Sequence, residues 1–125
     1  IQQYYHHCDG YFSGVGEELR KTFILAIGTR TISTSDNTDS LYTIFTSLLE
    51  ENSEYEKEEL MSQNDSIQIH GDIEYCYLLD FSKSVTYLYG CHAWDLSNKV
   101  GTNAELLQYI CQTQHILPLD KPVVD

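Results

Sequence analysis

The sequence predicts an α+β fold: a small antiparallel sheet of three or four strands, with helices packed mainly on one face. Two segments rich in β-branched and aromatic residues, 73–81 and 85–93, are separated by a short polar turn and predict a hairpin. Three other segments repeat apolar residues at helical spacing. Taken in order, the elements follow a β-α-α-β-β-β-α pattern, which we assign to a single domain over residues 1–125.

The first element is predicted to be a strand over residues 3–8, followed by a tight glycine turn. Tyr and His dominate this stretch, and both suit a pleated, half-buried surface. Asp9-Gly10 is a turn signal, and Gly14 and Gly16 would allow backbone angles that other residues avoid. We expect the strand to be clamped against the hairpin within 73–92.

A first helix is predicted from Val15 to Ile27, because apolar side chains recur there at every fourth residue. Glu17 and Glu18 lie in its first turn, where negative charge complements the helix dipole. Gly28 is expected to end the helix in a left-handed conformation, and the polar segment 29–38 to form a loop.

A second helix is predicted over residues 41–49, whose apolar residues share one helical face. Ser53 and Glu56 then fit a capping box. This pattern predicts a short acidic helix to about Met61, or else an extension of the second helix after a kink. The six Glu and one Lys of residues 50–59 are typical of a solvated face.

The hairpin is preceded by a predicted short strand over 67–70. Placing Phe81 opposite Ser84 sets Cys76 against Tyr89 across the hairpin. One face should pack on the helices, and the other should be a tyrosine-rich surface that is only partly covered. The residues predicted to share one face are Tyr75, Tyr77, Leu79, Leu88 and His92.

The last helix is predicted to begin at a second capping box, formed by Thr102 and Glu105, and to continue to about Cys111. Pro118 and Pro122 follow. Because proline disfavours a continuing helix, residues 116–125 are expected to form an extended tail.

Charge and cysteine usage limit the functional classes. The chain has 19 Asp and Glu against 7 Lys and Arg, a net charge of −12. Such a surface disfavours nucleic acid and anionic membranes, and no apolar run reaches the roughly 18 residues of a membrane span. The four cysteines form no CxxC pair. We therefore expect reduced, mostly buried thiols and a cytoplasmic protein with a protein partner; the oligomeric state is not indicated.

Residues 6–9 are four consecutive potential metal ligands, His-His-Cys-Asp. Because neighbouring side chains on a strand point to opposite faces, at most two of them could share an ion. His70 or His92 would have to complete the site, and the paired spacing typical of zinc ligands is absent. We therefore predict neither a metal nor a cofactor.

The loop from Asp9 to Gly16 leads into a helix N-terminus, a place where backbone N–H groups attract anions. It matches neither phosphate-binding fingerprint, and no diagnostic motif surrounds Cys8 or Ser13 as nucleophiles. We predict no catalytic residue. The candidate binding residues are His7, Asp9, Gly10, Tyr11, Gly14, Gly16, His92 and Trp94.

Most of these residues form a pattern that resembles a known motif. Between His7 and Gly16 the chain is similar to the form His-x-Asp-Gly-Tyr-Pro-x-Gly-x-Gly, found near the N-terminus of a group of small bacterial and bacteriophage proteins. Their later Glu-Tyr-x-Tyr strand resembles residues 74–77. Cys8 and Phe12 stand where those proteins commonly have Trp and Pro. The resemblance implies a mobile-element or gut-bacterial setting, and no particular reaction.

The sequence therefore favours a non-enzymatic interaction or accessory module, possessing a tyrosine-rich sheet face and an acidic segment at 50–59 for a protein partner. One alternative is a small-ligand or anion site, with or without enzymatic activity, on the His6–Gly16 loop with His92 and Trp94. A second alternative is an acidic mimic of nucleic acid or an inhibitor, which would place its carboxylates along one face.

Overall fold

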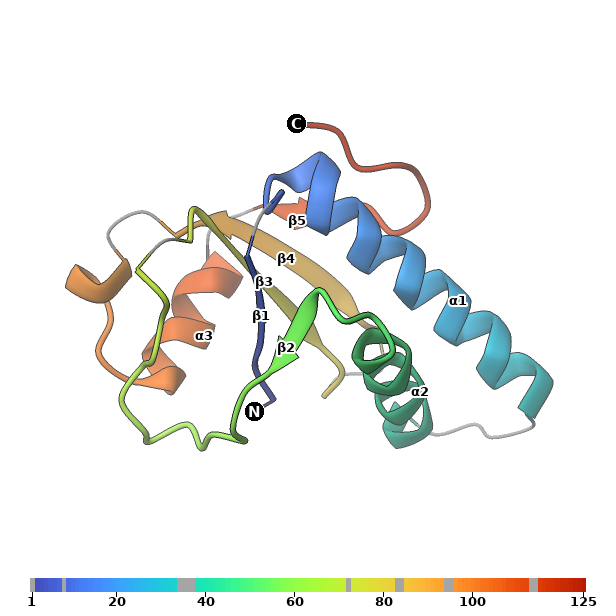
Figure 1. Cartoon of the computed structure of the whole chain (residues 1–125), viewed down its shortest axis with the longest axis horizontal. Helices are drawn as coiled ribbons and strands as arrows, with labels where there is room; N and C mark the ends of the chain where they lie inside the picture. Colours follow the sequence, from blue (N-terminus) through green and yellow to red (C-terminus); the bar gives the residue numbers. More distant parts are fainter. Residues whose placement is uncertain are drawn as a thin grey trace.

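Three layers build the fold, with a three-stranded antiparallel sheet in the middle (Figure 1). The computed structural model describes residues 2–7, 9–33, 38–71, 73–82, 85–93, 96–112 and 115–125, with the backbone alone for 29–33, 38–40 and 97. The elements are β1 (Tyr4–His6), a π-helical turn (Phe12–Gly16), α1 (Glu17–Ser33), α2 (Thr38–Glu50), β2 (Tyr55–Lys57), β3 (Tyr75–Asp80), β4 (Tyr87–His92), a 3-10 turn (Leu96–Asn98), α3 (Asn103–Gln112) and β5 (Ile116–Leu117).

The main core lies between the sheet and the pair α1–α2. Leu19 and Phe23 of α1 and Phe45 of α2 are buried against Leu88 of β4, whose exposed fraction is 0%. Tyr55 of β2 belongs to the same core, so the small β1–β2 sheet covers this face beside the helices. The helical spacing of apolar residues in the sequence therefore predicts the buried faces of α1 and α2 correctly.

α3 covers the opposite face of the sheet. Ile110 is buried there with Tyr89 and Cys91. The predicted capping box is confirmed: the Thr102 N–H donates to Glu105 Oε1 at 3.2 Å, and the Glu105 N–H donates to Thr102 Oγ1 at 3.3 Å. Two of the three described helices thus pack on one face, and both the α+β class and the predicted element order are confirmed.

The hairpin exists, but its register differs by two residues from the prediction. Cys76 lies opposite Cys91 rather than Tyr89, because the loop between β3 and β4 is longer than the predicted turn. A shift of two preserves which side chains share a face. Tyr75 and Tyr77 do share a face, where they contact Phe12 and are partly buried, in line with a tyrosine-rich surface that is only partly covered.

The first strand does not join the hairpin. β1 pairs antiparallel with β2, with Tyr5 opposite Glu56, and the two form a separate sheet. The helix predicted from Ser53 is therefore wrong. The chain there pairs with β1 instead, which buries Tyr55 in the core and leaves Glu56 and Lys57 exposed.

Two further expectations fail, and one holds with an addition. Residues 67–70 form no strand, although Ser66 makes an isolated bridge with Thr102. α1 continues through Gly28 to Ser33, and no described glycine has a positive φ. Glycine inside a helix costs only about 1 kcal/mol, which neighbouring turns can offset. The tail is not helical, as predicted, but Ile116–Leu117 pairs with β4 as an extra strand.

None of the described helices combines the length and the apolar character needed to cross a membrane.

Candidate functional site

The glycine turn after β1 is a tightly packed structure. Asp9 has a φ of 59°, and the Val15 N–H donates to its carbonyl at 3.0 Å. A Cβ on Gly14 would lie 2.3 Å from that carbonyl oxygen. A Cβ on Gly16 would lie 3.2 Å from side-chain atoms of both Tyr77 and Leu117. The two glycines therefore permit close approach rather than unusual backbone angles, and the left-handed residue is the aspartate.

Phe12 lies at the centre of a cluster of aromatic and histidine side chains at one end of the sheet. Its ring centroid lies 5.2 Å from that of Tyr75, 5.5 Å from His92 and 5.7 Å from His115. Gly10 also lies beside Tyr75, since a Cβ there would be 3.7 Å from the ring. Gly10 and His92 are thus two predicted site residues that meet at one aromatic ring.

His7 makes its described contacts elsewhere. Its Nδ1 lies 3.0 Å from the Tyr5 hydroxyl, and the Tyr5 ring stacks on His70 with centroids 3.8 Å apart. Tyr11 is 43% exposed, with its ring over Gly14. Trp94 lies outside the described residues. The predicted binding residues therefore divide between two locations, and Phe12 and His115 join the sheet cluster without any sequence motif to announce them.

An anion already occupies the start of the first helix. The Ser13 N–H donates to Asp125 Oδ1 at 3.0 Å, and the Ser13 hydroxyl donates to Oδ2. These hydrogen bonds lower the pKa of Asp125. The attraction for negative charge that the glycine loop predicted is satisfied here by a carboxylate of the same chain.

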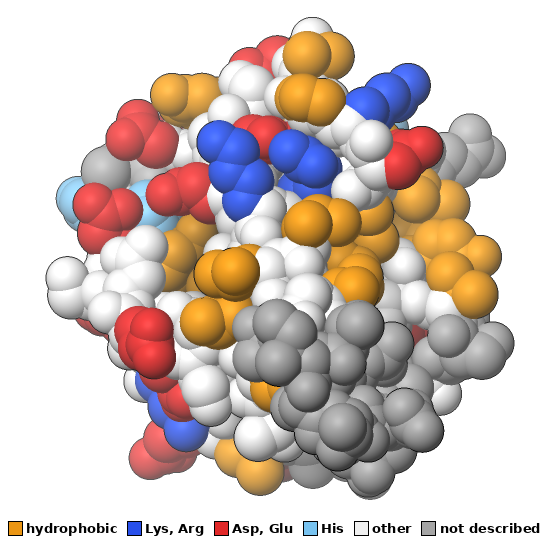
Figure 2. Space-filling model, turned by 90° about the vertical axis from the view of Figure 1, so that its right-hand side faces the viewer, with side chains coloured by type: hydrophobic (Ala, Val, Ile, Leu, Met, Phe, Trp, Pro, Cys, Tyr) orange, Lys and Arg blue, Asp and Glu red, His pale blue; other side chains and the backbone are white. Residues whose placement is uncertain are grey.

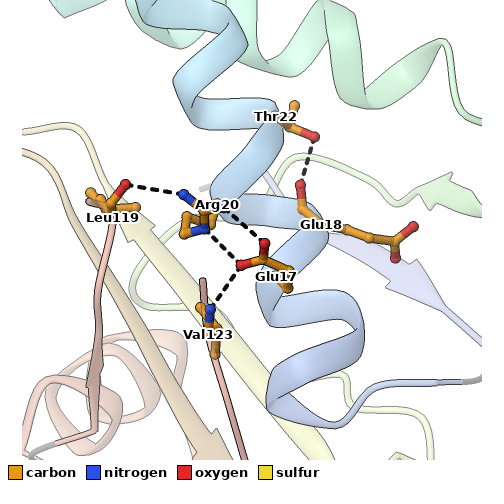
Figure 3. Close-up of polar contacts among 6 residues, drawn as sticks. All are labelled: Glu17, Glu18, Arg20, Thr22, Leu119 and Val123. Atoms are coloured by element: carbon orange, nitrogen blue, oxygen red, sulfur yellow. Dashed lines mark hydrogen bonds and ion pairs between the residues drawn. The ribbon is translucent and has the colours of Figure 1, made fainter. Parts of the chain in front are cut away.

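The C-terminal tail is fastened to α1 at further points (Figure 3). Glu17 receives two hydrogen bonds from Arg20, at 2.6 and 2.8 Å, and one from the Val123 N–H at 2.9 Å. The Arg20 bonds are the main reason that the pKa of Glu17 falls to about 2. Arg20 also donates to the Leu119 carbonyl at 3.5 Å. Leu119 and Val123 are thus attached to the first turn of α1.

The densest exposed charge lies around β2, in a region that we name the acidic edge (residues 50–59, with six Glu and one Lys). In Figure 2, acidic side chains lie along the left-hand side of the molecule, while most of the visible Lys and Arg side chains lie near the top. Glu50 pairs with Lys57 at 2.7 Å, and this lowers the pKa of Glu50. Among the described residues, Glu51, Glu56 and Glu59 take part in no ion pair.

Histidines border the acidic edge. His6 Nε2 lies 3.2 Å from Glu54, and His70 Nε2 lies 2.7 Å from Glu58. Beneath them, the Tyr4 hydroxyl is buried and forms no hydrogen bond of normal geometry with a described residue. Burial first, and then the nearby Glu50 carboxylate, raise the pKa of Tyr4 to about 12.

A shallow groove of about 220 Å³ adjoins this region, between α1, the end of α2 and β2. Glu18, Lys21 and Asn52 supply its polar lining, and the Tyr55 hydroxyl donates to Glu18 at 3.4 Å. Ligand pockets usually enclose about 300–1,000 Å³, so the groove is small. No group of three His, Cys, Asp or Glu residues in the described part of the chain is placed to hold a metal ion.

The chain matches no protein-family model, no curated protein and no solved structure. The resemblance noted for the His7–Gly16 motif therefore stays a prediction.

Proposed function

We propose that the protein is a non-enzymatic interaction module that docks a basic, extended segment of a partner protein along the acidic edge. The observation that carries the proposal is the concentration of six glutamates and one lysine around an exposed strand. A lysine- or arginine-rich segment would neutralise this charge. The net charge of −12 would also speed the encounter with such a partner.

The backbone of β2 supports binding in an extended form. The Glu58 N–H donates to the Gln3 carbonyl at 2.9 Å, so residues 3 and 58 form a hydrogen-bonded pair. Such pairs alternate with non-bonded pairs in an antiparallel ladder. Tyr4 and Lys57 form the next, non-bonded pair, so the amide and carbonyl of Lys57 face away from β1. An added strand is a common way for a peptide to use such groups.

The same charges argue against self-association through β2. Charged side chains on an edge strand repel a second copy of the same strand. Glu56 and Glu59 are exposed beside this edge. These glutamates would attract a basic segment and repel a second copy of the same acidic strand. The charge pattern therefore favours a basic partner over self-association.

The test uses a labelled short peptide of alternating lysine and threonine, with binding followed by fluorescence anisotropy. Affinity should fall steeply as salt rises from about 50 to about 300 mM, because exposed charges are screened. Glu56→Gln with Glu59→Gln should weaken binding about five-fold, taking roughly 0.5 kcal/mol for each charge. The control, Glu74→Gln with Asp120→Asn, makes the same change in net charge at exposed sites elsewhere.

A second peptide, methylated on alternate backbone nitrogens, separates strand addition from charge attraction. It keeps every positive charge but loses the donors that would pair with β2, so it should bind more weakly. Equal binding by both peptides would refute strand addition. Equal loss in the two double variants, or no binding at low salt, would refute the acidic edge as the docking surface.

A further inference from the structure

Two cysteines face each other across the hairpin. Cys76 of β3 lies directly opposite Cys91 of β4. The Ala93 N–H donates to the Glu74 carbonyl at 2.7 Å, which makes residues 74 and 93 a hydrogen-bonded pair. The alternation of an antiparallel ladder then makes Cys76 and Cys91 a hydrogen-bonded pair as well.

The ladder agrees with this assignment on its other side. The Gly90 N–H donates to the His115 carbonyl at 2.9 Å, so Gly90 turns its amide toward β5 and away from β3. Opposed residues in a hydrogen-bonded pair have Cα atoms about 5.5 Å apart. Disulfides span Cα separations of about 4.4–6.8 Å, which this pair meets, and Cβ separations of about 3.5–4.5 Å. The Cβ atoms of a hydrogen-bonded pair lie up to about 5.5 Å apart, so the two strands must draw closer at this point as the bond forms.

The surroundings make the two thiols different. Cys91 is only 2% exposed and packs with Ile110 of α3, while Cys76 is partly exposed on β3, the outer strand of its sheet. Both are free thiols. Hydrogen bonding between the two sulfurs raises the pKa of Cys76 and lowers that of Cys91.

We propose that Cys76 and Cys91 are a reversible modification site, which closes to a cross-strand disulfide when a low-molecular-weight disulfide such as oxidised glutathione is the oxidant. Cys76 is the thiol that the reagent reaches, because its side chain is partly exposed whereas that of Cys91 is buried. Cys91, directly opposite, is the thiol that completes the bond.

The chemistry proceeds in two exchanges. Cys76 loses its proton to solvent, and its sulfur attacks one sulfur of the reagent, which breaks the reagent's S–S bond and releases one thiol. The Cys91 thiol then loses its proton and attacks the Cys76 sulfur of the mixed disulfide, which breaks that S–S bond and releases the second thiolate, and the released thiolates take up the two protons. Two protein thiols are oxidised and one reagent disulfide is reduced to two thiols, so atoms and electrons balance.

The experiment uses the full chain carrying Cys8→Ser and Cys111→Ser, which leaves only the opposed pair. The reduced protein is equilibrated in buffers of increasing oxidised to reduced glutathione ratio, and intact mass is recorded after acid quenching. We expect the loss of two hydrogen atoms with no lasting glutathione adduct. Adding Cys91→Ser should instead leave one glutathione bound to Cys76. The temperature of thermal unfolding should rise when the disulfide of the two-cysteine protein forms, and it should return to its original value after reduction.

Two controls keep the result decisive. Phenylarsine oxide, which bridges neighbouring thiols, should bind the reduced pair at one equivalent and should not bind the protein that lacks Cys91. Circular dichroism of each variant checks that it is folded. A glutathione adduct that persists on the two-cysteine protein, or a disulfide that links two chains, would overturn the proposal.

Discussion

Adding one methyl group at two different glycines should have opposite effects on stability. Gly14→Ala places its Cβ 2.3 Å from the Asp9 carbonyl oxygen and 2.9 Å from the Tyr11 ring, so the turn must move. Gly28→Ala meets no atom within 4 Å, and Gly28 lies inside α1 without a positive φ. The same substitution therefore causes a steric clash at one site and only reduces chain freedom at the other.

The magnitudes follow from the contacts. Moving the turn breaks the hydrogen bond from Val15 to Asp9, worth about 1 kcal/mol, and overpacking adds about 1–3 kcal/mol. Gly14→Ala should therefore lower the free energy of unfolding by about 2–4 kcal/mol. Gly28→Ala should raise it by about 0.5–1 kcal/mol, because alanine has the higher helix propensity and a less flexible unfolded state.

Urea unfolding followed by far-ultraviolet circular dichroism measures both changes in one assay, with the slope of the transition checked for constancy. If Gly14→Ala were as stable as the parent chain, the turn would not be packed as described. If Gly28→Ala lowered the free energy of unfolding by more than about 1 kcal/mol, Gly28 would not lie in a helix interior.

Three further predictions concern single side chains. Glu17 has its pKa lowered from 4.5 to about 2, so its contribution to stability is present above pH 4.5 and is lost as the pH falls toward 2; Glu17→Gln should show a weaker loss over that range in acid unfolding. Tyr77→Phe removes the hydroxyl that donates to the Gly10 carbonyl and should cost about 1 kcal/mol in urea unfolding. Tyr4→Phe removes a buried hydroxyl that forms no hydrogen bond of normal geometry, so it should cost less than Tyr77→Phe. Leu88→Ala should cost about 2–5 kcal/mol by the same assay, because Leu88 is fully buried, and a smaller loss would mean that the core closes around the cavity.

Local periodicity was enough to predict α1, α2, α3 and the hairpin. Leu41, Phe45 and Leu49 are buried along one stripe of α2, as their spacing indicates. The faces of the hairpin were also predictable, since an error of two residues in register leaves each side chain on its own side. What helical or strand spacing encodes is which side of an element is buried, and that information is local.

The partners of the elements were not predictable in the same way. Ser53 and Glu56 match a capping box, yet the chain there forms β2, because Tyr55 gains burial in a core supplied by distant residues. The candidate site could not be predicted fully for the same reason, because its residues come from distant parts of the sequence. His7 and His92 both looked available, but His92 joins the sheet cluster through its pairing with Tyr75 and its contact with Phe12. No short-range pattern carries such long-range contacts.

The fastening of residues 119–125 to the start of α1 has a consequence for how the protein is made. Ser13 and Asp125 are separated by 112 positions, and buried Val123 donates to Glu17 across 106. At about 5–20 residues per second, a ribosome needs roughly 5–20 s to produce that intervening length. Until residues 119–125 emerge, the apolar stripe of α1 lacks the cover that Val123 supplies, so the nascent chain exposes part of this stripe during synthesis.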